Sequence, residues 1–287
     1  LYEYWIHIFV VQDVPHPITP WIKDFIENKK IVDVEIIKGD VIKSPSSDEY
    51  KELLQDRIIK SLKRRGKYII MSLDDERFNI IHLRMTGKLL YKQENEDIDK
   101  YSCVIYHLED KTKLIYADIR RLGTLDLITT DEISRLKGLY TLGAEPLSSE
   151  FTIGYLKDCL NKSKTKIKPF LLNQKNVAGL GNIYVDEALA ISKIHPERKA
   201  NSLGDEEIEK LYQAINLVIN EGIRDGGTSF RDYRNGLGEK GSHQDKLYVY
   251  NRKGKECRFC HTLITKIILN GRGTYFCPNC QKLNDDK

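Results

Sequence analysis

Short runs of hydrophobic residues, many of them β-branched or aromatic, dominate the first half of the chain. They are separated by polar turns and occupy 31–36, 67–73, 79–85, 102–108 and 113–119. Runs of this length bounded by turn residues are typical of β-strands. The pattern predicts an antiparallel β-sandwich or barrel.

After Gly123 the spacing of apolar residues becomes helical. They recur three or four positions apart in four segments, 131–138, 149–161, 167–173 and 205–221. Asp205 is a candidate N-cap for the last segment, and Thr19-Pro20 predicts the start of an earlier helix. The change of pattern predicts an α+β chain. Its first domain should end near 141, because glycine and proline interrupt the segment 142–148.

A long loop and a hairpin pattern follow. Residues 226–241 are rich in Gly, Ser, Asn and Arg, a composition typical of functional loops. The segment 262–275 has the pattern of a β-hairpin and joins two Cys-x-x-Cys pairs.

The composition is that of a globular protein. The 287 residues are 40% hydrophobic and 31% charged, which excludes disorder, collagen and coiled coil. The apolar run 5–11 is far shorter than the roughly 20 residues that cross a bilayer, and it lacks the pattern of an export signal. We therefore expect a cytoplasmic protein.

Positive charge gathers in the last part of the chain. Residues 224–287 include 13 basic and 7 acidic residues, whereas the first 223 residues include 33 and 35. This asymmetry favours a polyanionic partner for the last part, although zinc-bound thiolates would cancel some of the charge.

Four paired cysteines are the sharpest chemical signal. The two Cys-x-x-Cys pairs are separated by sixteen residues, whereas Cys103 and Cys159 stand alone. Without an export signal, this spacing indicates a metal site and not a disulfide framework. Four thiolates about 2.3 Å from one zinc ion leave no open coordination position, so the ion should be structural. The expected ligands are Cys257, Cys260, Cys277 and Cys280.

Three segments are candidate anion-binding elements. Arg272, between two glycines at a predicted hairpin tip, suits phosphate contact, and an ordinary solvated turn is the alternative. Glycines in 176–184 would let backbone amides approach an anion, and Asn182 would either cap a helix or reach a phosphate. The four lysines of 162–168 would form a solvated face or extend the same site.

Basic residues also mark strand ends in the first half. Lys67 would act as a proton donor, a Schiff-base nucleophile or a phosphate ligand, or it would only discourage strand pairing. The segments 82–87 and 118–123 combine arginines with Met85 and Leu122, which would either wedge into a base stack or belong to the core.

Together these motifs resemble the formamidopyrimidine-DNA glycosylase family, in its Fpg or MutM branch. The resemblance runs from about Lys29 to Gln281. The ordered motifs that carry it are Lys63-Arg-Arg-Gly-Lys67, His82-Leu-Arg-Met-Thr-Gly87, Asp118-Ile-Arg-Arg-Leu-Gly123, Leu142-Gly-Ala-Glu-Pro-Leu147, Val177-Ala-Gly-Leu-Gly-Asn-Ile-Tyr184, Leu247-Tyr-Val-Tyr250 and the zinc hairpin with Gly271-Arg-Gly-Thr274.

The resemblance implies a domain plan and an activity. The plan is a β-sandwich domain at 1–141, a helix-two-turn-helix domain at 142–241 and a zinc finger at 242–287, with damaged double-stranded DNA held in the cleft between. The lesion-recognition loop would be 226–241. The implied activity is that of a base-excision-repair glycosylase and AP lyase that removes 8-oxoguanine and formamidopyrimidines. We expect a monomer with one zinc ion in the bacterial cytoplasm, associated with the nucleoid and not with a membrane.

Individual residues also acquire roles from the resemblance. The residues expected to hold the phosphates beside an extruded nucleotide are Lys164, Asn182 and Arg272, with Arg121 as a further DNA contact. Those expected to fill the hole in the base stack are Met85, Arg120 and Leu122, the last in place of the family's usual phenylalanine. The positions that match proton donors in the elimination steps are Lys67 and Arg272.

Two stretches depart from the family. Its chains open with Pro-Glu, whose proline amine attacks the sugar C1′, but the aligned stretch 10–17 has no such pair and Leu1 comes first. Internal prolines cannot substitute, because their nitrogens are amides. Three explanations stay open: an altered gene end, a variant that binds lesions without cutting, and a variant whose nucleophile is Lys67 or the α-amino group of Leu1. The second departure is 100–103, where the family has a histidine-bearing turn that contacts DNA.

Overall fold

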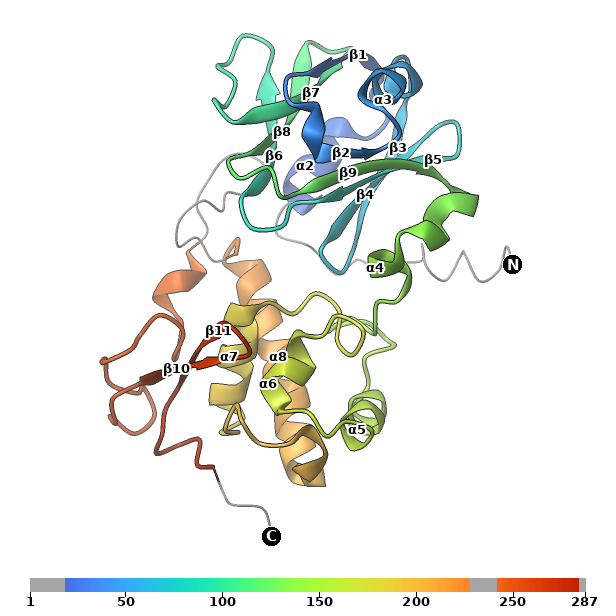
Figure 1. Cartoon of the computed structure of the whole chain (residues 1–287). Coiled ribbons are helices and arrows are strands. Elements are labelled where there is room, and N and C mark those ends of the chain that lie inside the picture. Colours follow the sequence, from blue (N-terminus) through green and yellow to red (C-terminus); the bar gives the residue numbers. More distant parts are fainter. Residues whose placement is uncertain (1–18, 228–241, 284–287) are drawn as a thin grey trace. The chain divides into compact units, whose positions relative to one another are not determined.

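The computed structural model describes residues 19–227 and 242–283, which form two compact units. Unit 1 contains the described residues up to Tyr140 together with 225–227 and 242, and unit 2 runs from Thr141 to Arg224 and continues from His243. Figure 1 shows the sheets of unit 1, coloured blue to green, and the helices of unit 2, coloured yellow-green to orange.

Unit 1 is built on two β-sheets. The four-stranded sheet is antiparallel and has the order β1 (Ile31–Ile36), β7 (Ser102–Leu108), β8 (Thr112–Asp118) and β6 (Gly87–Gln93). The five-stranded sheet has the order β2 (Ile42–Ser44), β9 (Thr124–Thr129), β5 (Arg77–His82), β4 (Tyr68–Leu73) and β3 (Ile59–Arg65). Its pairs are antiparallel except β2 with β9. The predicted α+β class with an antiparallel sandwich is confirmed.

One apolar core and one polar network join the two sheets. Buried residues from both sheets pack into a shared cluster with those of helices α2 (Thr19–Ile26) and α3 (Ser47–Leu54). Inside it, the Tyr50 hydroxyl donates to Asn79 Oδ1 at 2.9 Å, Asn79 Nδ2 donates to the Tyr106 hydroxyl at 3.1 Å, and the two hydroxyls lie 2.6 Å apart. Buried polar groups that satisfy one another fix a unique packing. This network therefore ties α3 to one strand of each sheet.

The helix predicted at 131–138 is interrupted. The chain forms a 3₁₀ segment, η2 (Thr130–Arg135), and then the short helix α4 (Lys137–Tyr140). Between them Leu136 leaves helical geometry, with φ −83° and ψ 67°. A further 3₁₀ segment, η1 (Gly39–Val41), precedes β2.

Unit 2 is helical and carries a two-stranded hairpin. Its helices are α5 (Ile153–Asn161), α6 (Ile167–Leu172), α7 (Asn182–Ile191) and α8 (Asp205–Arg224), with the 3₁₀ segments η3 (Ala200–Ser202) and η4 (His243–Asp245). Asp205 is not an N-cap; it lies inside the first turn of α8 with two glutamates, where carboxylates stabilise the positive end of the helix dipole. The hairpin consists of β10 (Thr265–Leu269) and β11 (Arg272–Phe276), and β11 packs against α7 (Figure 1). No helix in the described part of the chain is long and apolar enough to span a bilayer.

Candidate nucleic-acid interface

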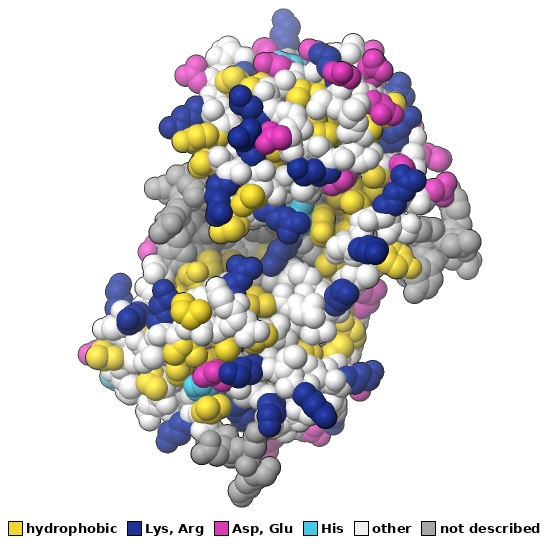
Figure 2. Space-filling model, viewed as in Figure 1, with side chains coloured by type: hydrophobic (Ala, Val, Ile, Leu, Met, Phe, Trp, Pro, Cys, Tyr) yellow, Lys and Arg dark blue, Asp and Glu magenta, His cyan; other side chains and the backbone are white. Residues whose placement is uncertain are grey.

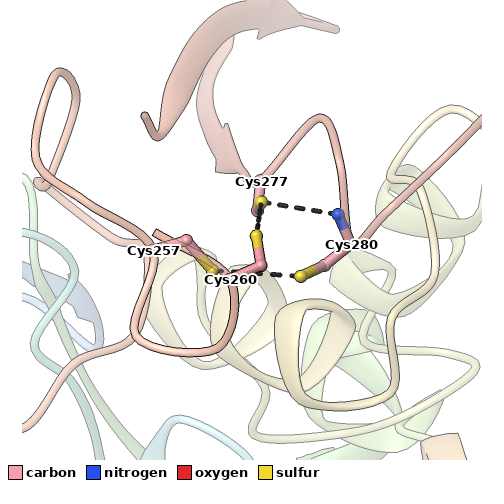
Figure 3. Close-up of side chains that lie close together, drawn as sticks. All are labelled: Cys257, Cys260, Cys277 and Cys280. Carbon is pink, nitrogen blue, oxygen red and sulfur yellow. Dashed lines mark hydrogen bonds between the residues drawn. The ribbon is translucent and has the colours of Figure 1, made fainter. Parts of the chain in front are cut away.

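Four cysteine side chains converge beside the hairpin. Their Sγ atoms all lie within 4.8 Å of one another, with Cys260 and Cys277 at 3.4 Å and Cys257 and Cys280 at 4.0 Å (Figure 3). A tetrahedral zinc ion with bonds of about 2.3 Å requires sulfur separations of about 3.8 Å. The backbone amides of Phe259 and Cys280 each donate to a cysteine sulfur at 3.4 Å. The geometry fits one structural zinc ion with four thiolate ligands, as predicted.

The hairpin turn fixes the position of Arg272. Asn270 and Gly271 have φ angles of 48° and 72°, the left-handed values of a two-residue hairpin turn, and Leu269 pairs with Arg272. The tip therefore consists of Asn270 and Gly271. The expectation that Arg272 lies at the tip is wrong, because Arg272 is the residue directly after the turn. Arg272 is the first residue of β11, and it is exposed.

Asn182 reaches across to this hairpin. Gly181 is the N-cap of α7, so Asn182 does not cap the helix. Its Nδ2 instead donates to the carbonyl oxygen of Gly273 at 3.1 Å, one residue from Arg272. Its Oδ1 is buried and has no hydrogen-bond partner in the described part of the chain. Two of the three residues expected to hold phosphates, Asn182 and Arg272, are thus brought together in unit 2.

Gly179, one of the two glycines before α7, acts differently from the expectation. Gly179 adopts φ 87°, which favours glycine, but its amide donates to Gln174 Oε1 at 2.9 Å and is not available to an anion. The Gly179 amide therefore belongs to the local hydrogen bonding before α7 and not to an anion site.

A buried ion pair lies behind the contact between Asn182 and the hairpin. Lys168 Nζ lies 2.7 Å from Asp186 Oδ1, and both side chains have 0% exposure. Lys168 also donates to the Gly273 carbonyl at 2.9 Å, and Asp186 accepts from the Tyr275 amide at 2.9 Å. Lys168 is therefore not part of a solvated lysine face, because the short helix α6 buries it together with its apolar neighbours.

Burial shifts the titration of both partners. It lowers the pKa of Lys168, an effect opposed by the Asp186 carboxylate and reinforced by the positive charge of Arg272. Burial likewise raises the pKa of Asp186 to about 7 against the opposing effect of Lys168. Each charge tolerates burial only because the other is beside it.

Glu187, the residue after Asp186, holds the chain that leads into the zinc site. Its carboxylate accepts hydrogen bonds from the amides of Tyr248, Val249 and Tyr250 at 2.5–3.0 Å. Burial raises the pKa of Glu187, and the three amides oppose the shift. Adjacent side chains of α7 therefore fasten the zinc-bearing segment at two places. The sequence reasoning missed this role, although two acids inside the apolar run Val185-Asp-Glu-Ala-Leu189 were a visible signal.

Lys164 stands apart from this cluster. It is exposed in the connection between α5 and α6, and no hydrogen bond or ion pair among the described residues joins it to Asn182 or Arg272. Figure 2 shows lysine and arginine side chains spread over the viewed face of unit 2, with few acidic ones among them.

In unit 1, the three residues expected to enter the base stack lie on two adjacent loops. Met85 follows β5 and is 67% exposed, and Leu122 follows β8 and is 46% exposed. Arg120 Nη1 donates to the Met85 sulfur at 3.4 Å. Arg121, the expected DNA contact, pairs with the half-exposed Asp40 at 3.2 Å.

Lys67 lies in the turn between β3 and β4, since β4 begins at Tyr68 and not at Lys67. Tyr68 pairs with His82, and its ring meets the edge of the imidazole with centroids 4.6 Å apart. Burial lowers the pKa of His82 to about 4, and the positive charges of Arg84 and Lys67 add to the effect. His82 Nδ1 accepts from the Arg84 amide at 3.1 Å. In the sequence, His82 was recognisable only as part of the motif His82-Leu-Arg-Met-Thr-Gly87, and its burial was not predicted.

Two predictions lie outside the described residues. They concern residues 1–18, with the stretch that lacks a Pro-Glu pair, and residues 228–241, which make up most of the expected lesion-recognition loop.

Comparisons with known proteins agree over almost the whole chain. Family models match at 17–125 (formamidopyrimidine-DNA glycosylase N-terminal domain), 142–234 (formamidopyrimidine-DNA glycosylase H2TH domain) and 254–283 (zinc finger found in FPG and IleRS). The formamidopyrimidine-DNA glycosylase of Pelotomaculum thermopropionicum is 43% identical over 254 residues, covering 88% of this chain and 92% of the relative. That of Bacillus cereus is 42% identical over 261 residues, covering 91% and 94%.

Solved structures agree as well. The Lactococcus lactis Fpg bound to DNA with an abasic site matches with a TM-score of 0.86 at 37% identity, covering 92% of this chain and 96% of that one. MutM bound to DNA with a carbocyclic 8-oxo-G matches with a TM-score of 0.86 at 37% identity, covering 93% and 97%.

Proposed function

The chain belongs to the formamidopyrimidine-DNA glycosylase family, and from this we propose that it is a base-excision-repair enzyme that removes oxidised purines from duplex DNA. The proposed substrates are 8-oxoguanine and formamidopyrimidines. The observation that carries the proposal is the convergence of Asn182 on the Gly273 carbonyl, next to Arg272, on a hairpin that a zinc site supports.

This convergence suits a phosphate clamp, by which we mean Asn182 and Arg272. Arg272 offers an exposed guanidinium, whose forked donors match phosphate oxygens. Asn182 adds an amide held in place by Gly273, and the positive charge of Lys168 lies behind it. Contacts to the DNA backbone supply most of the affinity and set the register of a protein on DNA. Lys164 would add positive charge elsewhere on the same unit.

Extrusion of the damaged nucleotide is the proposed role of the two loops of unit 1. An enzyme that acts on a base inside a duplex must take it out of the stack, and apolar side chains fill the gap that remains. Met85 and Leu122 present exposed apolar tips, and Arg120 lies in contact with Met85. We call Met85, Arg120 and Leu122 the wedge. Leucine fills less of the gap than the phenylalanine usual in the family.

The proposed chemistry starts with an amine of the enzyme. Its nitrogen bonds to the sugar C1′ while the glycosidic bond breaks, and the electron pair leaves with the base, which takes up a proton. Loss of a proton from the nitrogen and opening of the sugar ring give an imine, from which elimination cuts the strand. Lys67 and Arg272 are the proposed proton donors. The turn that carries Lys67 lies beside His82, and the low pKa of His82 keeps this imidazole neutral near pH 7.

Borohydride trapping on a duplex with a single 8-oxoguanine tests the proposal. We expect a covalent adduct and a nicked strand, because borohydride reduces the imine to a stable amine. Peptide mapping of the adduct would identify the amine, with Lys67→Met as the variant for the Lys67 alternative. Tight binding with neither adduct nor nick would contradict the proposed enzymatic activity. It would instead favour a protein that binds lesions without cutting the DNA. As the matched relatives are bacterial, we also propose that the protein acts in the cytoplasm on nucleoid DNA.

A further inference from the structure

The loop that carries Met85 ends, and the loop that carries Arg120 and Leu122 begins, at one pair of residues in the four-stranded sheet. Gly87, the first residue of β6, pairs with Asp118, the last residue of β8. The loop 83–86 is closed by the Gly87 amide, which donates to the Leu83 carbonyl at 3.0 Å. A Cβ on Gly87 would lie 2.4 Å from that oxygen, so only glycine permits the closure.

The second loop folds around the carboxylate of Asp118. Asp118 Oδ1 accepts from the Arg120 amide at 3.1 Å, and Oδ2 accepts from the Gly123 amide at 2.9 Å and from the Tyr116 hydroxyl at 3.4 Å. A Cβ on Gly123 would lie 1.9 Å from the Tyr116 hydroxyl. The loop 119–123 is thus held at both ends by one side chain.

Thr86 joins the first loop to the second. Its hydroxyl donates a short hydrogen bond to Asp118 Oδ1 and accepts from the Arg120 amide at 3.3 Å. Thr86 is 9% exposed and Asp118 2% exposed, whereas the wedge residues beside them stand in solvent. The polar side chains of Thr86 and Asp118, which connect the two loops, are therefore buried, whereas the apolar side chains of Met85 and Leu122 are exposed.

Only a carboxylate satisfies all these donors. Asp118→Asn would leave one acceptor oxygen, and the new NH₂ group would face donors that already point at that position. Thr86→Val would keep the volume of threonine and remove the hydroxyl that bonds the first loop to Asp118 and to the Arg120 amide. Hydrogen bonds to a buried charge are among the stronger ones in proteins, and a donor left unsatisfied is costly.

We propose that Asp118 and Thr86 are positioning residues that lock the two loops into one rigid element before DNA is met. This lock, formed by Asp118 and Thr86, holds the wedge residues in place and so promotes extrusion of the damaged nucleotide. It does not affect the binding of the protein to the DNA backbone. Preorganisation of a binding element lowers the conformational cost of the bound state. This inference rests on the proposed function, because it assumes that the wedge enters the stack.

The test measures extrusion and binding separately in the zinc-loaded full-length protein. Extrusion is followed by stopped-flow fluorescence of 2-aminopurine beside a tetrahydrofuran abasic analogue, and binding by anisotropy on an undamaged duplex. We expect Thr86→Val and Asp118→Asn to slow extrusion about tenfold, the effect of losing one buried hydrogen bond, with affinity for the undamaged duplex within about twofold of wild type. Thr86→Ser keeps the hydroxyl and should restore the wild-type rate.

Thr112 provides a matched control at the other end of β8. Its hydroxyl donates to Asp110 Oδ1 at 2.6 Å, so Thr112→Val removes the same kind of bond far from the wedge in the strand. Thr112→Val should leave extrusion unchanged. Melting temperatures are measured for all variants, and if Asp118→Asn does not fold, Thr86→Val decides.

The outcomes separate the inference from the proposed function. If Thr86→Val extrudes the nucleotide at the wild-type rate while Met85→Ala and Leu122→Ala do so slowly, the lock is wrong but the role of the wedge is supported. Wild-type extrusion in Met85→Ala and Leu122→Ala would overturn the wedge and the lock with it. An equal slowing in Thr112→Val would also overturn the lock, because the effect would then follow from general loss of stability.

Discussion

Lys168 and Asn182 donate hydrogen bonds to the same atom, the carbonyl oxygen of Gly273, at 2.9 and 3.1 Å. They come from the successive helices α6 and α7, and the acceptor belongs to the zinc-supported hairpin. One backbone oxygen therefore fixes the distance between the helical part of unit 2 and Arg272. This relationship makes the phosphate clamp a property of the folded unit and not of two independent surface residues.

Loss of either clamp residue should weaken binding without changing lesion preference. Arg272→Ala and Asn182→Ala should reduce affinity for damaged and undamaged duplexes alike, since phosphate contacts carry no sequence information. Arg272→Ala should also lower the salt dependence of binding by about one ion. Anisotropy titrations over a salt series measure both effects. Lys210→Ala, on an exposed position of α8, is the control and should have little effect; equal affinity of wild type and Arg272→Ala would contradict the clamp.

The buried ion pair should be sensitive to the loss of one partner. Lys168→Met or Asp186→Leu alone should cost about 3–5 kcal/mol of folding free energy, because each leaves an uncompensated buried charge. The double variant should cost less than either single variant. Urea unfolding of the three variants gives the comparison. Additive losses in the double variant would show that the two side chains do not depend on each other.

Removal of zinc should abolish DNA binding. Four thiolates hold the ends of the hairpin segment together, and a structural zinc contributes folding free energy directly. Complete chelation should release one zinc ion per chain and eliminate binding, and added zinc should restore it. Cys277→Ser should behave like the chelated protein. Full binding after verified removal of the metal would refute the supporting role of the zinc site.

His82 should make the protein less stable in acid. Its pKa in the folded protein is about 4, against 6.5 ordinarily. Between these two pH values, His82 is therefore protonated in the unfolded chain and neutral in the folded protein. This contribution is complete above pH 6.5 and is lost as the pH falls toward 4, in total on the order of 3 kcal/mol. Unfolding of wild type and His82→Gln at several pH values isolates the contribution. An NMR titration of His82 with a pKa near 6.5 would contradict the burial of the neutral ring.

Hydrophobic runs in the sequence predicted the central strands better than the edge strands. Four of the five predicted strands, β4, β5, β7 and β8, lie inside their sheets, and the fifth, β1, lies at an edge. The missed strands β2, β3 and β6 lie at sheet edges. Edge strands face water and tolerate charge, as the segment Ile59–Arg65 with its four basic residues illustrates. Only β9 was missed inside a sheet.

Local sequence patterns predicted part of the site, but they did not predict contacts between residues far apart in the chain. Cysteine spacing is local, so it predicted the zinc ligands, and motif resemblance pointed to Asn182 and Arg272. The contact between Lys168 and Gly273 spans 105 residues, and no periodicity encodes it. Lys168 was therefore grouped with its exposed lysine neighbours, although the fold buries it against Asp186.

The central claim is that Asn182 and Arg272 grip the same DNA backbone position. The direct measurement replaces single phosphates beside an abasic analogue with neutral methylphosphonates and determines the affinity for wild type, Asn182→Ala and Arg272→Ala. At one position the replacement should weaken wild-type binding, and this loss should shrink in both variants, because their phosphate contact is already gone. If the two variants lose sensitivity at different phosphates, or remain as sensitive as wild type at every position, the account of the clamp is wrong.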